Sequence, residues 1–233
     1  MSTNKLIHLY ASPWSERVRW AFTFKGVPYE KIEYRPGVDE EQVKKLTGQA
    51  QVPVLLTDGS VIPDSTAILN WLEQQKPEPR LMPESQKDQA QVVIWEELMD
   101  GVLGPQARLL VIGRLLPSND PELQQAANYF AQKYQYSPYA ESHARTIVKR
   151  ILPSLRHALD GREYLVGRSF TRADLFAASM VGLMNPASDD LFEFPVVMRQ
   201  AFTEPVAKDS EFAPIFAWRD EMYRKHRGEV VKP

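Results

Sequence analysis

The order of periodic segments in residues 1–77 constrains the fold of this chain more than any other feature. Short apolar runs suited to strands alternate with segments in which apolar residues recur every three or four positions, as in helices. The expected strands are 6–10, 29–34, 54–56 and 61–62, and the expected helices are 13–25, 40–46 and a segment opening at 65. Two strands separated by a helix are expected to pair in parallel, and two strands joined by a tight turn to form an antiparallel hairpin. The first part of the chain is therefore expected to fold around a mixed sheet.

Local signals support these boundaries. Ser12 and Pro13 supply a cap and a favoured first residue for the first helix, and Gly26 is a typical helix terminator. Asp58-Gly59, between two apolar runs, indicates a hairpin turn. The resulting order of strand, helix, strand, helix, strand, strand and helix is that of a thioredoxin-like α/β domain.

The rest of the chain has a different pattern. Pro77, Pro79 and Pro83 interrupt all periodicity, which favours a linker. We expect a thioredoxin-like domain at 1–77, a linker at 78–88 and an all-helical domain at 89–233. The expected helices of that second domain are 89–112, 121–135, 139–159, 171–184 and 214–226. Segment 185–211 fits neither a regular helix nor a loop of common length.

A capping box opens one of these helices. Thr171 stands at the N-cap position and Asp174 at the third helical position, where Glu or Gln is more usual, while Phe170 and Leu175 could pack as a hydrophobic staple. We interpret this pattern as a folding signal, which does not require a ligand.

Composition excludes several classes of function. The 233 residues are 43% hydrophobic, carry a formal net charge of −2 and include no cysteine. Such a charge gives no reason to expect nucleic acid or an anionic membrane as a partner. Without cysteine there can be no disulfide scaffold, thiolate metal site or cysteine nucleophile. With no signal-like or membrane-spanning apolar segment, we expect a soluble, cytoplasmic protein.

Two short motifs have the residue types needed to hold a small peptide. Pro53 enters a strand, so it removes one N–H from the sheet and leaves the polar backbone groups of Val52 free to pair with a ligand backbone. Asp64 and Ser65 begin a helix, whose first N–H groups attract a carboxylate. Both motifs also have a purely structural interpretation, as a strand entry and a helix cap.

Together with the N-terminal helix, these motifs resemble those of cytosolic glutathione transferases, and the resemblance spans nearly the whole chain. The first helix looks most like that of the serine-type classes, particularly the tau-like ones. The matching segments are Ala11-Ser12-Pro13-Trp14-Ser15-Glu16-Arg17-Val18-Arg19, Gln51-Val52-Pro53-Val54, Asp64-Ser65 and the box at 170–174.

The resemblance implies a thioredoxin-like domain that binds glutathione, a helical domain that contributes a hydrophobic second-substrate site, and a homodimer. We expect the dimer surface at Trp95, Leu98 and Met99, near the linker. Ser12 would be the catalytic hydroxyl and Pro53 a cis-proline. Val52 would pair its backbone with the cysteinyl unit of glutathione, and Asp64 and Ser65 would hold the γ-glutamyl end. The implied activity is transfer of glutathione, the co-substrate, to small hydrophobic electrophiles, with hydroperoxide reduction as a related reaction and detoxification as the role.

Ser12 has the chemistry that this activity needs. A thiol with a pKa near about 8.5 is mostly protonated at neutral pH, so the enzyme must favour the thiolate. The Ser12 hydroxyl can donate a hydrogen bond to sulfur, and the helix that begins at Pro13 directs its positive end to the same place. Ser12 could instead be a plain N-cap, and Ser15 and Tyr10 are alternative hydroxyl groups for the same role.

Gln51 departs from the family pattern. Tau-like transferases usually carry a basic residue at this position, where it helps to hold the glycyl carboxylate. Gln51 can form a hydrogen bond but adds no charge. Two alternatives stay open: Arg35, Lys44 or Lys45 compensates from the preceding loop and helix, or glutathione binds more weakly.

Other chemistries find less support. The four histidines have no metal-ligand spacing, and we assign no metal. Ser12 lacks the Gly-x-Ser-x-Gly elbow of a hydrolase. Two alternatives to a transferase stay open: a non-catalytic protein of the glutathione transferase fold, and a glutathione-dependent isomerase or dehalogenase.

Overall fold

The computed structural model describes residues 4–232, and the chain divides into two compact units, Met1–Leu81 (unit 1) and Met82–Pro233 (unit 2). This division falls inside the stretch 78–88, where the sequence favours a linker. Within residues 4–232, no helix combines the length and the apolarity needed to cross a membrane.

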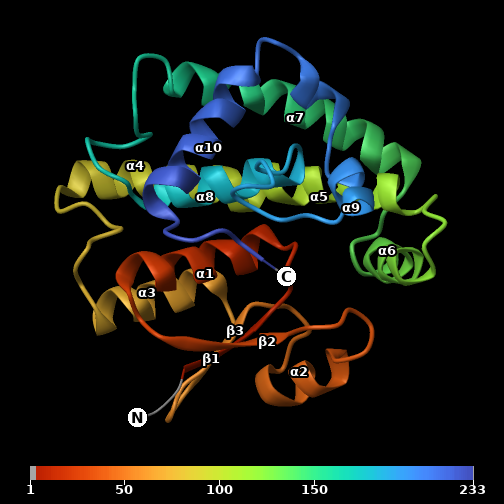
Figure 1. Ribbon diagram of the computed structural model, residues 1–233, viewed down its shortest axis with the longest axis horizontal. Helices are drawn as coiled ribbons and strands as arrows, with labels where there is room; N and C mark the ends of the chain where they lie inside the picture. Colours follow the sequence, from red (N-terminus) through yellow and green to blue (C-terminus); the bar gives the residue numbers. More distant parts are fainter. Residues whose placement is uncertain (1–3, 233) are drawn as a thin grey trace. The chain divides into compact units, whose positions relative to one another are not determined.

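Unit 1 is built on a four-stranded mixed sheet (Figure 1). Its strands are β1 Asn4–His8, β2 Tyr29–Glu33, β3 Val54–Leu56 and β4 Val61–Ile62. In the order β2-β1-β3-β4, β1 pairs in parallel with β2, and β3 is antiparallel to both β1 and β4. The parallel pair and the hairpin expected from the sequence are thus confirmed.

Helices cover both faces of this sheet. They are α1 Pro13–Lys25, α2 Glu40–Thr47 and α3 Ser65–Gln75. In Figure 1, α1 and α3 lie side by side on one face and α2 lies on the other. Successive side chains of a strand point to opposite faces, so Leu6 and Ile7 of the central strand are both buried, and Ile7 packs with Val43 of α2.

The end signals of α1 act as expected. Ser12 is the N-cap in extended conformation, Pro13 is the first helical residue, and Gly26 follows the helix with a φ of 61°. A positive φ suits glycine because it has no side chain to clash with the backbone. These signals fix where the first turn of α1 begins, and therefore where Ser12 lies.

The beginning of the expected linker is fastened to unit 1. Lys25, which is 1% exposed, donates from Nζ to the carbonyl oxygens of Lys76 (2.8 Å) and Pro79 (2.7 Å) and pairs with Glu73 at 3.0 Å. The Glu78–Pro79 peptide bond is cis. A single buried ammonium group therefore fixes the chain where it leaves α3.

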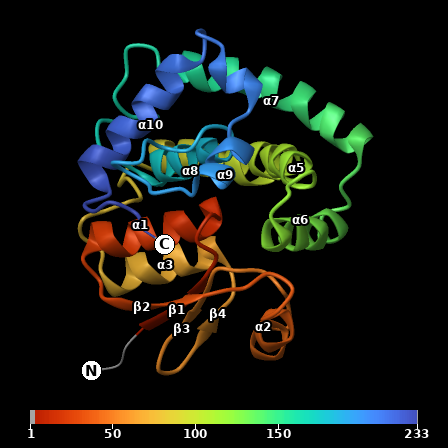
Figure 2. The same ribbon diagram turned by 45° about the vertical axis from the view of Figure 1, so that its right-hand side comes forward.

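Unit 2 is helical throughout its regular structure. Its helices are α4 Gln86–Glu97, the π-helical segment Leu98–Leu103, α5 Gly104–Leu115, α6 Pro121–Lys133, α7 Pro138–Ala158, α8 Arg172–Met180, the 3-10 segment Val181–Leu183, α9 Val196–Ala201, the 3-10 segment Pro205–Lys208 and α10 Ala213–His226. Every residue of α8 is buried, because α4 and α10 pack against it, while α5 packs along α7 (Figure 2). The expected thioredoxin-like unit followed by an all-helical unit is confirmed.

The single helix expected at 89–112 is wrong in detail. A π-helical segment separates α4 from α5 and contains Gly101, and Gly104-Pro105 follow it at once. Glycine weakens a helix, and proline cannot donate the backbone hydrogen bond of a regular turn. Apolar periodicity runs through all three pieces, so it could not reveal the change in backbone geometry.

Segment 185–211 also has more structure than its sequence suggests, since it contains the short helix α9. Arg199 of that helix donates to the carbonyl oxygens of Ala187 (2.8 Å) and Phe192 (3.0 Å). The regular structure of segment 185–211 thus depends on contacts within the segment rather than on a long periodic pattern.

The capping box at the start of α8 is confirmed. The Asp174 carboxylate accepts hydrogen bonds from the backbone N–H of Thr171 (2.9 Å) and from that of Leu165 (2.7 Å). Burial raises the pKa of Asp174 to about 6, although these hydrogen bonds oppose the shift. The box therefore secures both the first turn of α8 and the loop before it.

Candidate functional site

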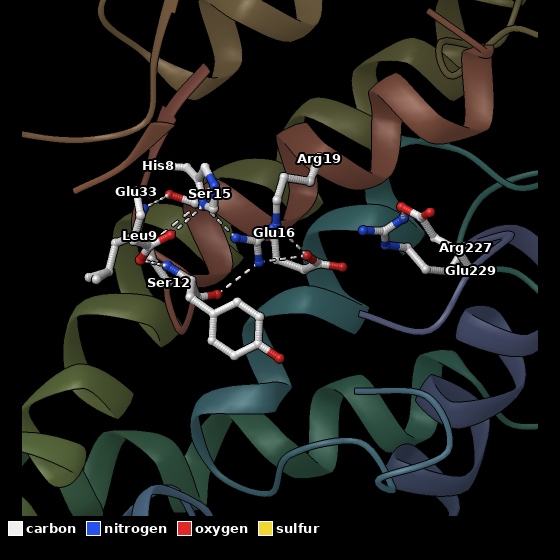
Figure 3. A network of polar contacts seen from close by, with 10 residues as sticks. His8, Leu9, Ser12, Ser15, Glu16, Arg19, Glu33, Arg227 and Glu229 are labelled. Carbon is white, nitrogen blue, oxygen red and sulfur yellow. Dashed lines mark hydrogen bonds and ion pairs between the residues drawn. The ribbon is translucent and has the colours of Figure 1, made fainter. Parts of the chain in front are cut away.

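The loop at residues 9–12, between β1 and α1, holds the expected catalytic serine. The Ser12 N–H donates to the Leu9 carbonyl (3.1 Å), and the Leu9 N–H donates to Ser15 Oγ (3.1 Å). The Tyr10 N–H donates to a Glu33 carboxylate oxygen (2.8 Å). Side chains from both α1 and β2 thus hold the backbone of this short loop (Figure 3).

A buried guanidinium group completes the support. Arg19 is 1% exposed and donates from Nη2 to the Tyr10 carbonyl (2.8 Å). Its Nε and Nη2 also donate to one oxygen of Glu16, at 2.9 and 2.7 Å, and Glu16 is itself buried. The ion pair balances the Arg19 charge, so that the guanidinium can fix the loop without leaving an unpaired charge in the interior.

His8 joins this network as a neutral ring. Arg19 Nη1 lies 2.8 Å from His8 Nδ1, and because a guanidinium group only donates, Nδ1 must accept and the ring proton must be on Nε2. Burial, with the nearby charges of Arg19 and Lys31, lowers the pKa of His8 to about 3. Its 3.3 Å contact with the Glu33 carboxylate is therefore not an ion pair at neutral pH.

The three candidate hydroxyl groups at this end of α1 differ in their surroundings. Ser15 is fully buried, and its Oγ is committed to the Leu9 N–H. Tyr10 is half-buried, with the Arg19 guanidinium 5.5 Å from its ring centre. Ser12 is also half-buried, and its Oγ accepts only a long cap hydrogen bond, 3.5 Å from the Ser15 nitrogen. Among residues 4–232, no acceptor takes the Ser12 hydroxyl proton, so this group can donate to a ligand.

The Val52–Pro53 peptide bond is cis, as the family resemblance implies. Pro53 is buried and directly precedes β3. The β1–β3 ladder runs to the pair Ile7 and Val54, and Val52 lies beyond that pair. Its backbone polar groups are therefore at the open end of the ladder, where a ligand backbone could pair with them.

At the start of α3, the side chains of Asp64 and Ser65 make different hydrogen bonds. Asp64 is the N-cap, and its Oδ1 accepts from the Ala67 N–H at 2.8 Å. Ser65 is buried, and its Oγ accepts a 2.5 Å hydrogen bond from Nη2 of the equally buried Arg17. Arg17 thus ties α1 to the first turn of α3.

The sheet brings these segments together at one end. In the antiparallel pairing of β1 with β3, the end of β1 lies beside the start of β3. In the pairing of β3 with β4, the end of β4 lies beside that same start. These three strand ends are followed or preceded by the Ser12 loop, Val52-Pro53 and Asp64-Ser65. All the predicted site residues of unit 1 therefore lie at the same end of the sheet.

Gln51 is exposed, and the cations that could compensate for its missing charge are not equivalent. Arg35 pairs with Asp39 at 2.7 Å, and Lys44 pairs with Glu40 at 2.7 Å. Lys45 is exposed and has no ion-pair partner within residues 4–232. Of the three, Lys45 is the cation most available to a ligand carboxylate.

Sequence reasoning missed the roles of Arg17 and Arg19. Both are almost fully buried, although charged residues in a helix are usually solvated. A detectable signal was the spacing of Glu16 and Arg19, which allows an ion pair across one helical turn. No pattern in the sequence indicates that Arg17 bonds to Ser65. Within residues 4–232, no group of three or more His, Cys, Asp or Glu side chains could hold a metal ion.

Comparisons with known proteins show which proteins this chain is similar to. Residues 6–80 match the family described as glutathione S-transferase, N-terminal domain. A probable glutathione S-transferase from Nicotiana tabacum is 25% identical over 226 residues, covering 95% of this chain and 84% of the relative. The maleylacetoacetate isomerase of Rattus norvegicus is 28% identical over 197 residues, covering 82% of this chain and 83% of the relative.

The fold comparison extends over both units. A crystal structure of a glutathione S-transferase from Methylobacillus flagellatus, with glutathione bound, has a TM-score of 0.69 and 20% identity. The match covers 99% of this chain and 100% of the other. Residues 6–80 thus belong to the glutathione S-transferase N-terminal domain family, and the chain as a whole has the fold of the glutathione transferases.

Proposed function

We propose that this protein is a glutathione transferase in which Ser12 stabilises the thiolate of bound glutathione. The observation that carries the proposal is the Ser12 hydroxyl, which lies at the start of α1 with its proton uncommitted within residues 4–232. The loop beneath it is held by hydrogen bonds to Ser15, Glu33 and Arg19. A fixed donor at a helix N-terminus is suited to hold an anionic sulfur.

The helix N-terminus and the Ser12 hydrogen bond supply enough free energy to lower the pKa of the thiol without a charged base. Lowering a thiol pKa by about two units requires about 2.7 kcal/mol. A helix N-terminus contributes about 0.3–2 kcal/mol and a hydrogen bond to a charged group about 1.5–3 kcal/mol. His8 is unsuited as a general base, because Arg19 occupies its acceptor nitrogen.

Glutathione would lie at the end of the sheet where three segments meet: the Ser12 loop, Val52-Pro53 and Asp64-Ser65. In this arrangement the Val52 backbone pairs with the cysteinyl unit beside Pro53, and Asp64 and Ser65 hold the γ-glutamyl end. Gln51 donates to the glycyl carboxylate, with Lys45 as the nearest available cation in sequence. The co-substrate is then fixed at both ends while its sulfur faces Ser12.

The second substrate would be a small hydrophobic electrophile, which the thiolate attacks at carbon, or a hydroperoxide, which it reduces. Residues 89–233 would contribute the apolar site for it. We also propose that the protein is a cytoplasmic homodimer.

The thiolate itself provides the test. The thiol of bound glutathione should titrate with a pKa of about 6.5, two units below that of a free thiol, when the ultraviolet absorbance of the thiolate is followed. Ser12→Ala should raise this pKa and lower kcat/KM toward a generic aryl halide about 10- to 100-fold. Ser60→Ala, an exposed position of the same unit, is the control. Full activity in Ser12→Ala would rule out the mechanism, and glutathione binding without turnover on halides, isothiocyanates or peroxides would favour a non-catalytic protein.

A second candidate function is supported by the maleylacetoacetate isomerase among the relatives. A thiolate can add to a double bond conjugated with a carbonyl group, allow rotation, and leave again, so that glutathione is regenerated. Product analysis distinguishes the two functions, because a transferase consumes glutathione and an isomerase does not.

A further inference from the structure

The Gln49 side chain makes an unusual set of contacts beside the proposed glutathione site. Its Oε1 accepts from the Gln51 N–H at 2.5 Å, and its Nε2 donates to the Pro63 carbonyl at 2.9 Å. The same Nε2 lies 3.4 Å from the Gln51 carbonyl. The proposed site has two arms, residues 51–53 and residues 64–65. One amide group therefore contacts Gln51 of the first arm and Pro63, which directly precedes the second.

The sheet cannot make this connection itself. The β3–β4 ladder ends at the pair Leu55 and Ile62, and the next residues toward the site include Pro53 on one strand and Pro63 on the other. Proline has no N–H and cannot donate a ladder hydrogen bond. Neither Pro53 nor Pro63 has an N–H that could extend the ladder beyond Leu55 and Ile62, and the Gln49 amide connects Gln51 with Pro63 instead.

Gln49 is itself held in place. Thr47 Oγ1 lies 2.8 Å from the Gln49 carbonyl oxygen and 3.2 Å from the Gln49 nitrogen. Thr47 Oγ1 also reaches the Val43 carbonyl at 2.9 Å, at the last turn of α2. The amide bridge is therefore anchored to a helix and does not rest on a free side chain.

We propose that Gln49 is a positioning residue that sets the separation of the two glutathione-holding arms, and so determines glutathione affinity without touching the reacting sulfur. This inference rests on the proposed function, since it assumes that glutathione binds at both arms. Loss of the bridge should weaken binding and leave thiol activation by Ser12 intact, because the Ser12 loop is held by a separate network.

Two variants test the bridge. Gln49→Met keeps the length of the side chain and removes both hydrogen-bonding groups. Gln49→Glu keeps an acceptor for the Gln51 N–H but loses the donor to Pro63, where a carboxylate would face a carbonyl oxygen. Gln42→Met, an exposed position on α2, is the matched control.

Glutathione binding is measured by isothermal titration calorimetry, and KM and kcat with an aryl halide. Both Gln49 variants should raise the Kd and the KM for glutathione about tenfold, with kcat and the pKa of the bound thiol unchanged. Gln42→Met should leave all four quantities as in the parent. A role confined to stability would lower the melting temperature and leave Kd unchanged, which would overturn the inference.

The outcomes separate this inference from the proposed function. If the parent binds glutathione and either folded Gln49 variant binds it within twofold of the parent, the bridge is not a determinant of affinity and the proposed function stands. If the parent itself does not bind glutathione, the proposed function fails and the inference fails with it. Should Gln49→Met not fold, Gln49→Glu carries the same test.

Discussion

Ser12 and Ser15 show how one residue's surroundings decide its role. Both hydroxyl groups lie in the first turn of α1, but Ser15 Oγ is buried and accepts the Leu9 N–H, whereas the Ser12 proton has no acceptor within the described part of the chain. The sequence alone leaves both residues, and Tyr10, as candidates. Their difference depends on a bond to the preceding strand end, which no local pattern encodes.

His8 gives a prediction at the same scale. Its pKa is lowered to about 3 in the folded protein, from an ordinary value of 6.5, so protons bind the unfolded chain more strongly. Stability is therefore lost as pH falls below 6.5, and from pH 7 to pH 5 this one group should cost about 2 kcal/mol of unfolding free energy. Asp174, with its pKa raised to about 6, acts in the opposite direction, so variants must be compared.

The measurement is urea unfolding at both pH values. His8→Gln, which keeps an acceptor for Arg19, should remove about 2 kcal/mol of the loss that His8 causes between pH 7 and pH 5. His157→Gln, at an exposed position, should leave the difference as in the parent. An identical pH dependence in parent and His8→Gln would show that burial and the Arg19 charge do not keep the His8 ring neutral.

At the scale of elements, the sequence predicted what local chemistry determines. The ends of α1, the hairpin at Asp58-Gly59 and the capping box of α8 each depend on residues within a few positions of one another. The π-helical segment Leu98–Leu103 and the helix α9 depend on backbone register and on contacts between distant residues, such as that of Arg199 with Ala187. Periodicity cannot detect either feature.

Helix α8 allows the strength of its cap to be tested. Asp174→Ala would leave the N–H groups of Leu165 and Thr171 buried without acceptors, and each such group costs about 1–3 kcal/mol. We expect unfolding free energy to fall by about 3 kcal/mol or more in urea titrations at pH 7. Asp120→Ala at the exposed N-cap of α6 is the matched control and should cost only about 1 kcal/mol. Equal losses in the two variants would contradict a special role for burial at Asp174.

For the whole molecule, the sequence predicted both architectures. It did not predict how the edge of unit 1 is assembled, because the contacts of Arg17 with Ser65 and of Gln49 with Pro63 join residues distant in sequence. Of the residues expected at a dimer surface, Trp95 and Leu98 are half-buried, and Met99 needs correction. Met99 is fully buried within the chain, whereas Val93 and Ile94 on α4 are exposed.

This correction changes the test of the proposed homodimer. Ile94 is 65% exposed, and a large exposed apolar side chain on a helix favours a contact with a second copy. Light scattering at micromolar concentration should give a mass near twice 26.7 kDa for the parent and near 26.7 kDa for Ile94→Glu, because a carboxylate at a closed apolar interface cannot keep its hydration. Val196→Glu on α9, 72% exposed, is the control and should remain a dimer. A monomeric parent would refute the dimer, and a dimeric Ile94→Glu would exclude this face of α4 as its interface.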